Sequence, residues 1–308
     1  MAPLHGVTVS RFRNLFYRHF GGIDEMMAPF LPVVDAPNVR ARQWKDILPQ
    51  NNENLKVVPQ LMGNDPVQFV NTLHILADMG FSAANWNIGC PMQQIVRKRR
   101  GCGLMPHPDL VEKVVEAVCA RTTTRFSIKM RLGLKSPQEG LELLRRLESY
   151  PLDFIVIHPR LGVQQYEGVP DWDAFDTLFA ATSHEVVYSG DVWSVADYQR
   201  LQQRYPAIRQ WMLGRGLLRN PFLAEQIKSL DEAVDKQRFS IFYADLLDSW
   251  HASGLTDKGI LNSLKELWHY FAVFCDLSDL QLQQLLREDN LVAFEQKSRD
   301  AINHIFTK

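Results

Sequence analysis

The sequence predicts a (β/α)8 TIM barrel followed by an all-α C-terminal domain. Along residues 1–234, short apolar, β-rich runs alternate regularly with amphipathic helical stretches, as expected for parallel βαβ units. Several of these runs are continuously apolar, which is typical of strands buried on both faces. After about residue 235 no strand signal remains, and apolar residues recur at three- and four-residue spacing. We therefore expect the barrel at 1–234 and the helical domain at 235–308.

The barrel strands can be placed individually except for the first. Seven apolar runs are expected to be strands, at 23–31, 56–62, 83–89, 126–132, 153–159, 185–190 and 209–214. An eighth fits only at Met1–Leu4, so the first strand is either very short or begins upstream of this sequence. A doubly wound sheet is the alternative, but no GxGxxG motif follows a first strand.

Helices are expected between these strands and throughout the C-terminal domain. Asp65-Pro66 is one helix start, because proline is well tolerated at the first helical position. The interstrand helices are expected at 8–20, 66–80, 108–121, 137–149, 173–183, 194–205 and 219–229. The C-terminal domain should hold three or four helices, with a core that includes Trp250, Trp268, Phe271 and Phe274.

Composition narrows the class of protein. The 308 residues carry a formal net charge of −1, so nucleic-acid binding would need cations gathered on one face. The four cysteines form no CxxC pair and match no zinc spacing, which indicates free thiols in a reducing compartment and no metal site. No apolar run approaches the roughly 20 residues of a membrane span, and we see no signal peptide. We expect a cytoplasmic protein with no membrane partner.

Polar and glycine residues stand at the predicted carboxyl ends of the strands, where TIM barrels place their active sites. Gly190 in YSGD and Gly214 in LGRG each precede a helix. Backbone N–H groups freed at such turns, with Arg215 beside them, favour a phosphate site. The alternative is that these glycines only close tight turns.

Lys129 and His158 end adjacent strands and are candidates for cofactor chemistry. A buried lysine can stabilise negative charge on the polar edge of a flavin, and Gln60 can hydrogen-bond to that edge. The alternative for Lys129 is a buried ion pair within the barrel, and for His158 a hydrogen-bonded core histidine.

Cys90 lies between Gly89 and Pro91 at a strand end, which favours an exposed loop. A thiol in that place can act as a nucleophile or a proton donor, although a lone cysteine is more often a small buried hydrophobe. Cys102 lies in the same loop between two glycines, which indicates close packing. We therefore prefer Cys90 as the reactive thiol.

Four consecutive cations follow in the same loop, Arg97, Lys98, Arg99 and Arg100. Such a run is usually a solvated surface, but beside a catalytic loop it could hold a nucleic-acid backbone. Arg11 and Arg13 could extend that surface, and Lys258, Lys265 and Arg287 could form a second basic patch on the helical domain.

Taken together, these motifs resemble the tRNA-dihydrouridine synthases over essentially the whole chain. The most specific segment is NWNIGCPMQQIVRKRRGCGLM at 85–105. Further matches are MAPLHGVT (1–8), VPQLMGN (58–64), IKMRLG (128–133), IHPRLGVQQYEGVPDW (157–172), SGDVW (189–193) and LGRGLLRNP (213–221). Trp193 and FLPVVD (30–35) make the bacterial C subgroup the nearest match.

The resemblance implies an FMN-dependent enzyme that reduces the C5–C6 double bond of a uridine in tRNA to 5,6-dihydrouridine. Hydride would pass from N5 of FMN to C6 after reduction by NADPH, and Cys90 would protonate C5. Asn87 and Arg131 would hold the flipped-out uridine. A monomer is the family expectation, with the helical domain binding tRNA. The implied FMN contacts are Pro3, Leu4, His5, Gln60, Lys129, His158, Ser189, Gly190, Asp191, Gly214 and Arg215.

The sequence departs from the family pattern at several positions. Asn85 replaces an aspartate, Ser189 replaces the asparagine of an NGD or NGE motif, and HPRL (158–161) replaces HGRT. Leu4 replaces a methionine. The reactive groups are all retained. A thiol that donates a proton must itself stay protonated, so the four loop cations should point away from the sulfur of Cys90.

Two other functions stay open from the sequence. A flavin-dependent reductase of free pyrimidines or small enones would need neither the cationic run nor the helical domain, and it would be indifferent to salt. A non-catalytic tRNA-binding protein would be unaffected by Cys90→Ala.

Overall fold

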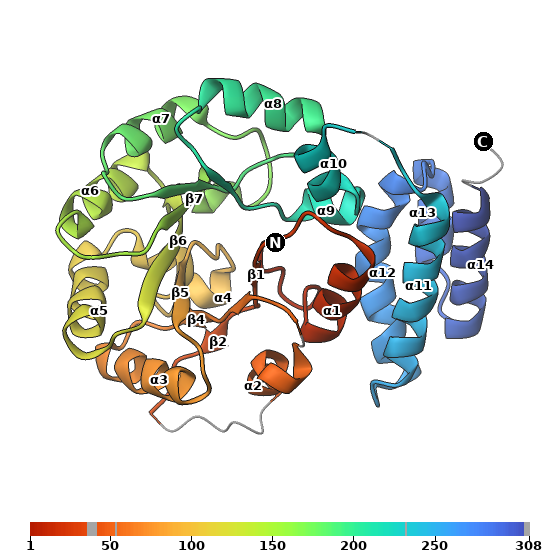
Figure 1. Cartoon of the computed structure of the whole chain (residues 1–308), viewed down its shortest axis with the longest axis horizontal. Coiled ribbons are helices and arrows are strands. Elements are labelled where there is room, and N and C mark those ends of the chain that lie inside the picture. The colour runs from red at the N-terminus through yellow and green to blue at the C-terminus, as the bar shows by residue number, and fades with distance from the viewer. Residues whose placement is uncertain (36–41, 53, 232, 305–308) are drawn as a thin grey trace.

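The computed structural model describes residues 1–35, 42–52, 54–231 and 233–304. Within them the strands are β1 (Met26–Met27), β2 (Leu31–Pro32), β3 (Val57–Val58), β4 (Gln60–Met62), β5 (Ala83–Ile88), β6 (Arg125–Gly133), β7 (Ile155–Leu161), β8 (Val186–Tyr188) and β9 (Gln210–Trp211). Seven of them form one parallel sheet in the order β2-β4-β5-β6-β7-β8-β9, and β1 pairs with β3. The helices surround this sheet as an outer ring (Figure 1). The predicted barrel is confirmed.

The N-terminal segment completes the barrel, although it is too short to be a regular strand. The Ala2 N–H donates to the Leu213 carbonyl oxygen at 2.7 Å, and the Met27 N–H donates to the Met1 carbonyl oxygen at 3.1 Å. Met1 and Ala2 therefore lie between β9 and β1, in the position of the eighth strand, and the N-terminus stands inside the ring in Figure 1. Pro3 follows directly, at the carboxyl end of this segment.

Four of the outer helices begin at a polar side chain that caps them. Asp65, Ser136, Asp171 and Ser194 each accept a hydrogen bond from a backbone N–H of the helix that follows, which satisfies groups that the helix itself cannot. The helices are α1 (Ser10–His19), α2 (Arg42–Ile47), α3 (Pro66–Asp78), α4 (Gln93–Val96), α5 (Pro108–Arg121), α6 (Pro137–Leu147), α7 (Trp172–Ala180), α8 (Val195–Arg204), α9 (Arg215–Arg219) and α10 (Leu223–Ser229).

The last barrel helix differs from the single one predicted at 219–229. It is divided into α9 and α10 because Asn220 precedes Pro221 and adopts an extended conformation, with φ −144° and ψ 95°. A residue before proline is sterically disfavoured in the helical region. Helix α9 begins at Arg215, shortly after β9.

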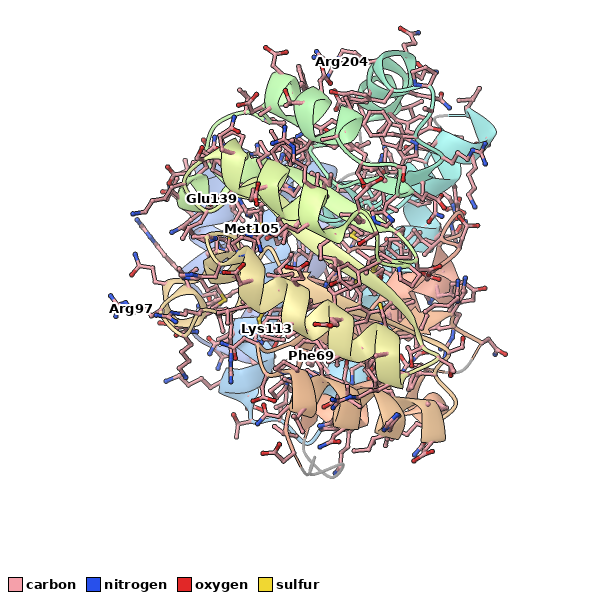
Figure 2. The ribbon with its side chains drawn as sticks, turned by 90° about the vertical axis from the view of Figure 1, so that its left-hand side faces the viewer. Phe69, Arg97, Met105, Lys113, Glu139 and Arg204 are labelled. Carbon is pink, nitrogen blue, oxygen red and sulfur yellow. The ribbon has the colours of Figure 1, made fainter. Side chains whose placement is uncertain are left out.

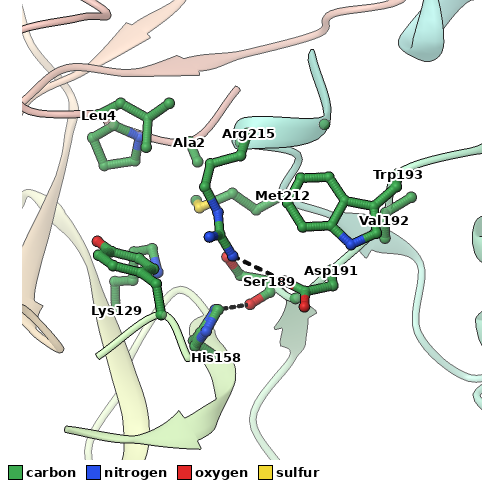
Figure 3. Close-up of a pocket in the computed structure, with 15 residues that line it drawn as sticks. Ala2, Leu4, Lys129, His158, Ser189, Asp191, Val192, Trp193, Met212 and Arg215 are labelled. Carbon is green, nitrogen blue, oxygen red and sulfur yellow. Dashed lines mark hydrogen bonds and ion pairs between the residues drawn. The ribbon is translucent and has the colours of Figure 1, made fainter. Parts of the chain in front are cut away.

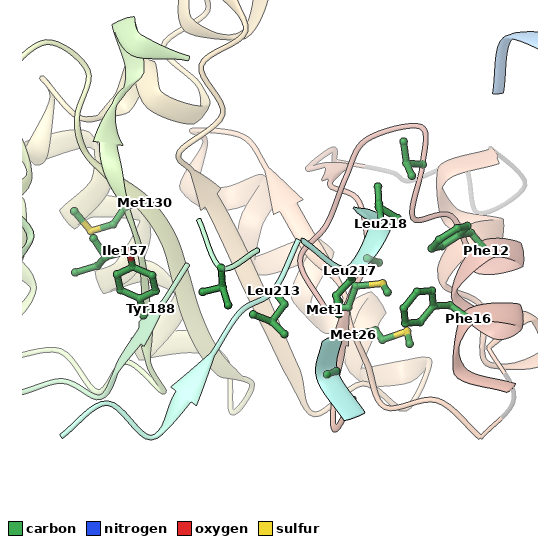
Figure 4. Packing of buried hydrophobic residues seen from close by; sticks show 14 of the residues in the cluster. Met1, Phe12, Phe16, Met26, Met130, Ile157, Tyr188, Leu213, Leu217 and Leu218 are labelled. Carbon is green, nitrogen blue, oxygen red and sulfur yellow. The ribbon is translucent and has the colours of Figure 1, made fainter. Parts of the chain in front are cut away.

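Side chains from successive strands fill the layer between the sheet and the outer helices, where Tyr188 contacts Trp172 and Phe175 of α7. Met130, Ile157 and Tyr188, from β6, β7 and β8, are at most 1% exposed and lie together in Figure 4. The same core continues to Phe12 and Phe16 of α1. Burial on both faces explains why the strands read as unbroken apolar runs.

Four C-terminal helices follow: α11 (Lys236–His251), α12 (Asp257–Phe274), α13 (Asp279–Leu286) and α14 (Leu291–His304). They stack beside α1 at one side of the barrel (Figure 1). Phe242 of α11 packs against Phe20 with ring centroids 4.9 Å apart, and Phe274 of α12 stacks on Phe222 at 5.8 Å. Since these contacts join the two regions, one hydrophobic core extends from the barrel into the helices.

No helix in the described part of the chain has the length and apolar character needed to cross a membrane.

Candidate active site

Two adjoining cavities open where the barrel strands end. The larger has a volume of about 470 Å³ and the smaller about 80 Å³, and both are lined by Lys129, His158 and Arg215. Every residue predicted above for catalysis, cofactor binding or uridine binding lines at least one of them: Pro3, Leu4, His5, Gln60, Asn87, Cys90, Lys129, Arg131, His158, Ser189, Gly190, Asp191, Gly214 and Arg215. Residues from seven strand ends are thus brought into one pocket.

Lys129 supplies an unpaired positive charge to both cavities. No carboxylate among the described residues pairs with its ammonium group. Burial, assisted by the neighbouring Arg131 and opposed by Cys90, lowers the pKa of Lys129 to about 8. The alternative of a buried ion pair is therefore wrong within this part of the chain. An anionic group in the cavity would stabilise the charged form.

His158 is held as a neutral side chain. Burial, followed by the nearby charges of Lys129 and Arg131, lowers the pKa of His158 well below its usual range. Its Nδ1 lies 2.5 Å from the Ser189 carbonyl oxygen, and its Nε2 lies 3.3 Å from a guanidinium nitrogen of Arg160. Nδ1–H therefore donates to the carbonyl, and Nε2 accepts from Arg160. The ring is fixed on both edges.

Asp191 joins two arginines beside the smaller cavity. Arg160 contacts both of its carboxylate oxygens, at 3.0 and 2.5 Å, and Arg215 contacts one of them at 3.0 Å. Figure 3 shows the guanidinium of Arg215 directed toward Asp191, with Trp193 beside it. Because the carboxylate already has two cationic partners, only the backbone N–H of Asp191 is suited to meet a phosphate.

The turns around the smaller cavity require glycine. A Cβ on Gly190 would lie 2.5 Å from the hydroxyl oxygen of Tyr188, and one on Gly216 would lie 2.1 Å from the carbonyl oxygen of Val192. The N–H groups of Gly190 and Asp191 donate to no other group among the described residues. These turns therefore leave donors open beside Arg215, as a phosphate cradle needs.

A chain of amides connects the larger cavity to the loop that carries Cys90. The Gln60 amide nitrogen donates to the Asn85 side-chain oxygen at 2.8 Å, and the Asn87 amide nitrogen donates to the Gln60 side-chain oxygen at 2.8 Å. Asn85, fully buried, donates in turn to Ser127 at 2.9 Å. Asn85 stands where the family has an aspartate. It therefore places a neutral amide in a network whose side chains are hydrogen-bonded to one another. Each amide has a fixed orientation.

The loop of Cys90 closes against a glycine. The Cys102 N–H donates to the Cys90 carbonyl oxygen at 2.9 Å. Gly101, between the cationic run and Cys102, has φ +53°, and a Cβ there would lie 2.7 Å from that same oxygen. The glycine-rich end of the motif therefore allows the loop to return to the strand end.

The two cysteines of this loop have different surroundings. Cys90 is partly exposed and lines the larger cavity, whereas Cys102 is buried and its thiol lies 3.4 Å from the Gly133 carbonyl oxygen. Burial raises the pKa of both thiols, that of Cys102 to about 12. The cations that partly offset the shift at Cys90 are Arg131 and Lys129, and not those of the loop. Cys90 is thus a protonated thiol facing a cavity.

Arg131 forms part of the cavity wall next to Cys90. Its Nε donates to the Gly89 carbonyl oxygen at 3.0 Å, and one terminal nitrogen donates to the Leu161 carbonyl oxygen at 2.9 Å. The guanidinium carbon lies 5.3 Å from the ring centroid of Tyr166. These contacts hold a buried cation in the wall of the larger cavity.

The four loop cations lie outside the pocket. Arg97, Lys98 and Arg99 are exposed, no carboxylate among the described residues pairs with any of the four, and Arg97 projects outward in Figure 2. Arg13 was expected to extend this surface, and that prediction is wrong. It is fully buried and binds Asp46 at 2.9 Å and Asn52 at 2.7 Å. A buried guanidinium needs such partners, so Arg13 supports the fold.

Several residues of the pocket were missed by the sequence argument. Tyr166 lies in the loop after β7 and lines both cavities. Glu266 and Tyr270 of α12 also line the larger cavity. They stand four residues apart, the spacing of one helix face, but only the fold reveals that this face meets the barrel. The helical region therefore forms part of the pocket wall.

The fold and pocket define a TIM barrel with a polar cavity at the carboxyl ends of its strands. The chain is similar to the old yellow enzyme of Trypanosoma cruzi, with a TM-score of 0.53, 11% identity and coverage of 75% of this chain and 88% of that one. It is also similar to morphinone reductase in complex with tetrahydroNAD, with a TM-score of 0.53, 11% identity and coverage of 80% and 92%. At this identity the likeness shows the fold alone.

Comparisons of sequence identify the family. The family model described as Dihydrouridine synthase (Dus) matches residues 1–288. A probable tRNA-dihydrouridine synthase of Rhodobacter capsulatus is 32% identical over 230 residues, covering 74% of this chain and 69% of that one. A tRNA-dihydrouridine(16) synthase of Pseudomonas putida is 28% identical over 276 residues, covering 87% and 80%. The chain therefore belongs to the dihydrouridine synthase family, whose members are FMN-dependent oxidoreductases that reduce uridine in tRNA.

Proposed function

We propose that this enzyme reduces a uridine of tRNA to 5,6-dihydrouridine with Cys90 as the proton donor. The observation that carries the proposal is the placement of a protonated thiol and an unpaired ammonium, Lys129, on the walls of one cavity. Reduction of a C5–C6 double bond needs hydride at one carbon and a proton at the other. When bound, FMN supplies the hydride to C6 and is itself reduced by NADPH.

The residues of the smaller cavity fit the phosphate of FMN. Arg215 and the open N–H groups of the Gly190 turn offer donors for a phosphate, while Ser189 and Gly214 shape its walls. Lys129 and Gln60 would hold the polar edge of the flavin ring, with His158, Pro3, Leu4 and His5 around it. An anion at Lys129 would relieve the unfavourable burial of an unpaired cation.

Cys90 would transfer its proton to C5 of the uracil and be left as a thiolate. Arg131 and Lys129 lie close enough to lower the pKa of the thiol, so they also stabilise that thiolate after the transfer. Solvent then returns the proton. Arg131 and one amide hydrogen of Asn87 would hold the uracil oxygens, since flipping removes the base from its partners in the RNA.

The four loop cations would bind the phosphates of the tRNA near the pocket. Their charge is uncompensated and lies on the loop that carries Cys90, so they can neutralise phosphates without altering the thiol. We expect the enzyme to act as a monomer. We place the enzyme in the cytoplasm, where tRNA is modified.

The test is an absorption spectrum of the purified protein, followed by turnover with NADPH on tRNA that lacks dihydrouridine. Flavin bands and dihydrouridine in the product are expected, and position 16 is examined first because several relatives are named for it. Flavin bands with turnover only on small enones would favour a free-substrate reductase. Protein that cannot be reconstituted with FMN but binds tRNA would favour the non-catalytic alternative.

A further inference from the structure

Three arginines and two aromatic rings alternate in a row that begins in the wall of the larger cavity and ends outside both cavities. Tyr166 lies between Arg131 and Arg215, whose guanidinium carbons are 5.3 and 4.9 Å from its ring centroid. Trp193 lies between Arg215 and Arg219, at 5.0 and 4.1 Å. Each of these distances is within the range of a cation–π interaction. The row runs from the uridine end of the pocket, past the phosphate cradle, to its outer edge.

Arg219 is the member of this row that no function above uses. It stands one helical turn beyond Arg215 on α9 and lines neither cavity. Arg215 is paired with Asp191, whereas no carboxylate pairs with Arg219 among the described residues, and its Nε is buried without a hydrogen-bond partner. The charge of Arg219 is thus held in place by Trp193 while its hydrogen-bonding capacity is unused.

The surroundings of Arg219 lie where the barrel meets the helical region. Helix α9 packs against α12, and the charge of Arg219 acts on the hydroxyl of Tyr270, which lines the larger cavity. A nucleic-acid strand whose uridine enters this cavity must leave it across the rim, and its phosphates continue outside the pocket. A guanidinium stacked on an aromatic ring is pre-organised to bind such a phosphate.

We propose that Arg219, clamped on Trp193, binds a backbone phosphate of the tRNA strand beside the target uridine. The proposal rests on the proposed function. FMN cannot be the partner if its phosphate occupies the cradle at Gly190 and Arg215, because Arg219 lies outside that cavity. The reductant also carries phosphates, so its reaction is measured separately below.

The experiment compares FMN-loaded wild type with Arg219→Ala, Arg219→Lys and the control Arg209→Ala. Arg209 is an exposed arginine at the opposite end of β9. Binding of unmodified tRNA is measured against salt concentration, and stopped-flow absorbance follows flavin reduction by NADPH and flavin reoxidation by tRNA. FMN content is read from the ratio of visible to ultraviolet absorbance.

Arg219→Ala should weaken tRNA binding about tenfold and reduce the slope of log affinity against log salt by about 0.7 to 0.9. Reduction by NADPH and FMN content should stay at wild-type values. Arg219→Lys should keep the salt slope but recover only part of the affinity, because it lacks the planar stacked fork. Arg209→Ala should match wild type.

Wild-type binding and salt slope in Arg219→Ala would overturn the inference. So would a defect confined to reduction by NADPH, which would assign the residue to the reductant, or a loss of FMN, which would assign it to the cofactor. If wild type itself produced no dihydrouridine, the proposed function would fail instead. The two failures are therefore distinguishable.

Discussion

The side-chain oxygen of Asn87 accepts a hydrogen bond from the backbone N–H of Cys90 at 2.9 Å. The same oxygen accepts from the Gly89 N–H at 3.1 Å, and the amide nitrogen donates to Gln60. Asn87 therefore fixes both the turn that presents the thiol and the orientation of Gln60. Only the second amide hydrogen of Asn87 is then left to bind the uridine.

Asn87→Ala should displace the thiol and release the Gln60 amide, while leaving the phosphate cradle intact. We expect the reoxidation of reduced flavin by tRNA to slow by about 100-fold, because small misplacements of a reacting group cost that much. Reduction by NADPH should change little. Asn87→Asp retains the acceptor for both N–H groups and should keep more of the rate. Equal losses in the two variants would show that the turn does not position Cys90. Both rates are measured by stopped-flow absorbance.

The elements of the fold were predictable because their causes are local. Alternating strands and helices, proline at helix starts and glycine at turns are all visible in the sequence. The eighth barrel position was predicted as a segment at Met1–Leu4 but not as a regular strand, since Met1 and Ala2 are held by single hydrogen bonds to the carbonyl oxygen of Glu25, to β1 and to the segment after β9. Two residues are too few to show the periodicity of a strand. The closure of the barrel at this position therefore becomes visible only when the sheet is assembled.

The pocket was predictable where residues stand at strand ends. Lys129 and His158 were found in this way, because parallel strands end on one face. Arg13 was misplaced because a sequence does not reveal that Asp46 and Asn52 surround it. Glu266 and Tyr270 were missed because the docking of α12 depends on aromatic contacts between the barrel and the helices.

Lys129→Met should stabilise the flavin-free protein in a pH-dependent way. The pKa of Lys129 falls from 10.5 to about 8 on folding, so between these values the unfolded chain binds more protons and stability rises with pH. Removal of the amine should raise the free energy of unfolding by up to about 3 kcal/mol at pH 7, and the gain should fade toward pH 10.5. Denaturation in urea at several pH values measures it. A gain in the free energy of unfolding that does not vary with pH would contradict a lowered pKa of Lys129 in the folded protein. FMN binding should weaken in the same variant.

Asp191→Asn should destabilise the protein and release FMN. It removes the charge that offsets Arg160, whose side chain is only 2% exposed, and loss of one partner of such a pair costs about 3 kcal/mol or more. The matched control is Asp173→Asn, which removes a 97% exposed partner of Arg204 and should cost less than about 1 kcal/mol. Thermal unfolding and flavin fluorescence are the measurements. Similar effects in the two variants would mean that burial of the Asp191 pair has no energetic importance.

Replacement of Arg97, Lys98, Arg99 and Arg100 by glutamine should weaken tRNA binding without altering chemistry. The slope of log affinity against log salt should fall by about 3, at about 0.7 to 0.9 unit per lost phosphate contact. At saturating tRNA the rate of flavin reoxidation should stay near wild type, because none of the four shifts the pKa of Cys90. A slope equal to that of wild type would show that the run is only a solvated surface.

Cys90→Ala should abolish the tRNA-dependent half of the reaction and leave the other half unchanged. Loss of a positioned proton donor typically slows a reaction by about 10² to 10⁴-fold, so flavin reoxidation by tRNA should slow by that factor while NADPH reduces the flavin normally. Cys102→Ala is the matched control, because that thiol is buried beside Gly133 and lines neither cavity. In wild type the rate of reoxidation should be constant through neutral pH. It should fall only as the pH rises through the raised pKa of Cys90, since the thiol and not the thiolate donates. A rate that increases over the same range would identify the thiolate as the reactive form and remove Cys90 from the role of acid.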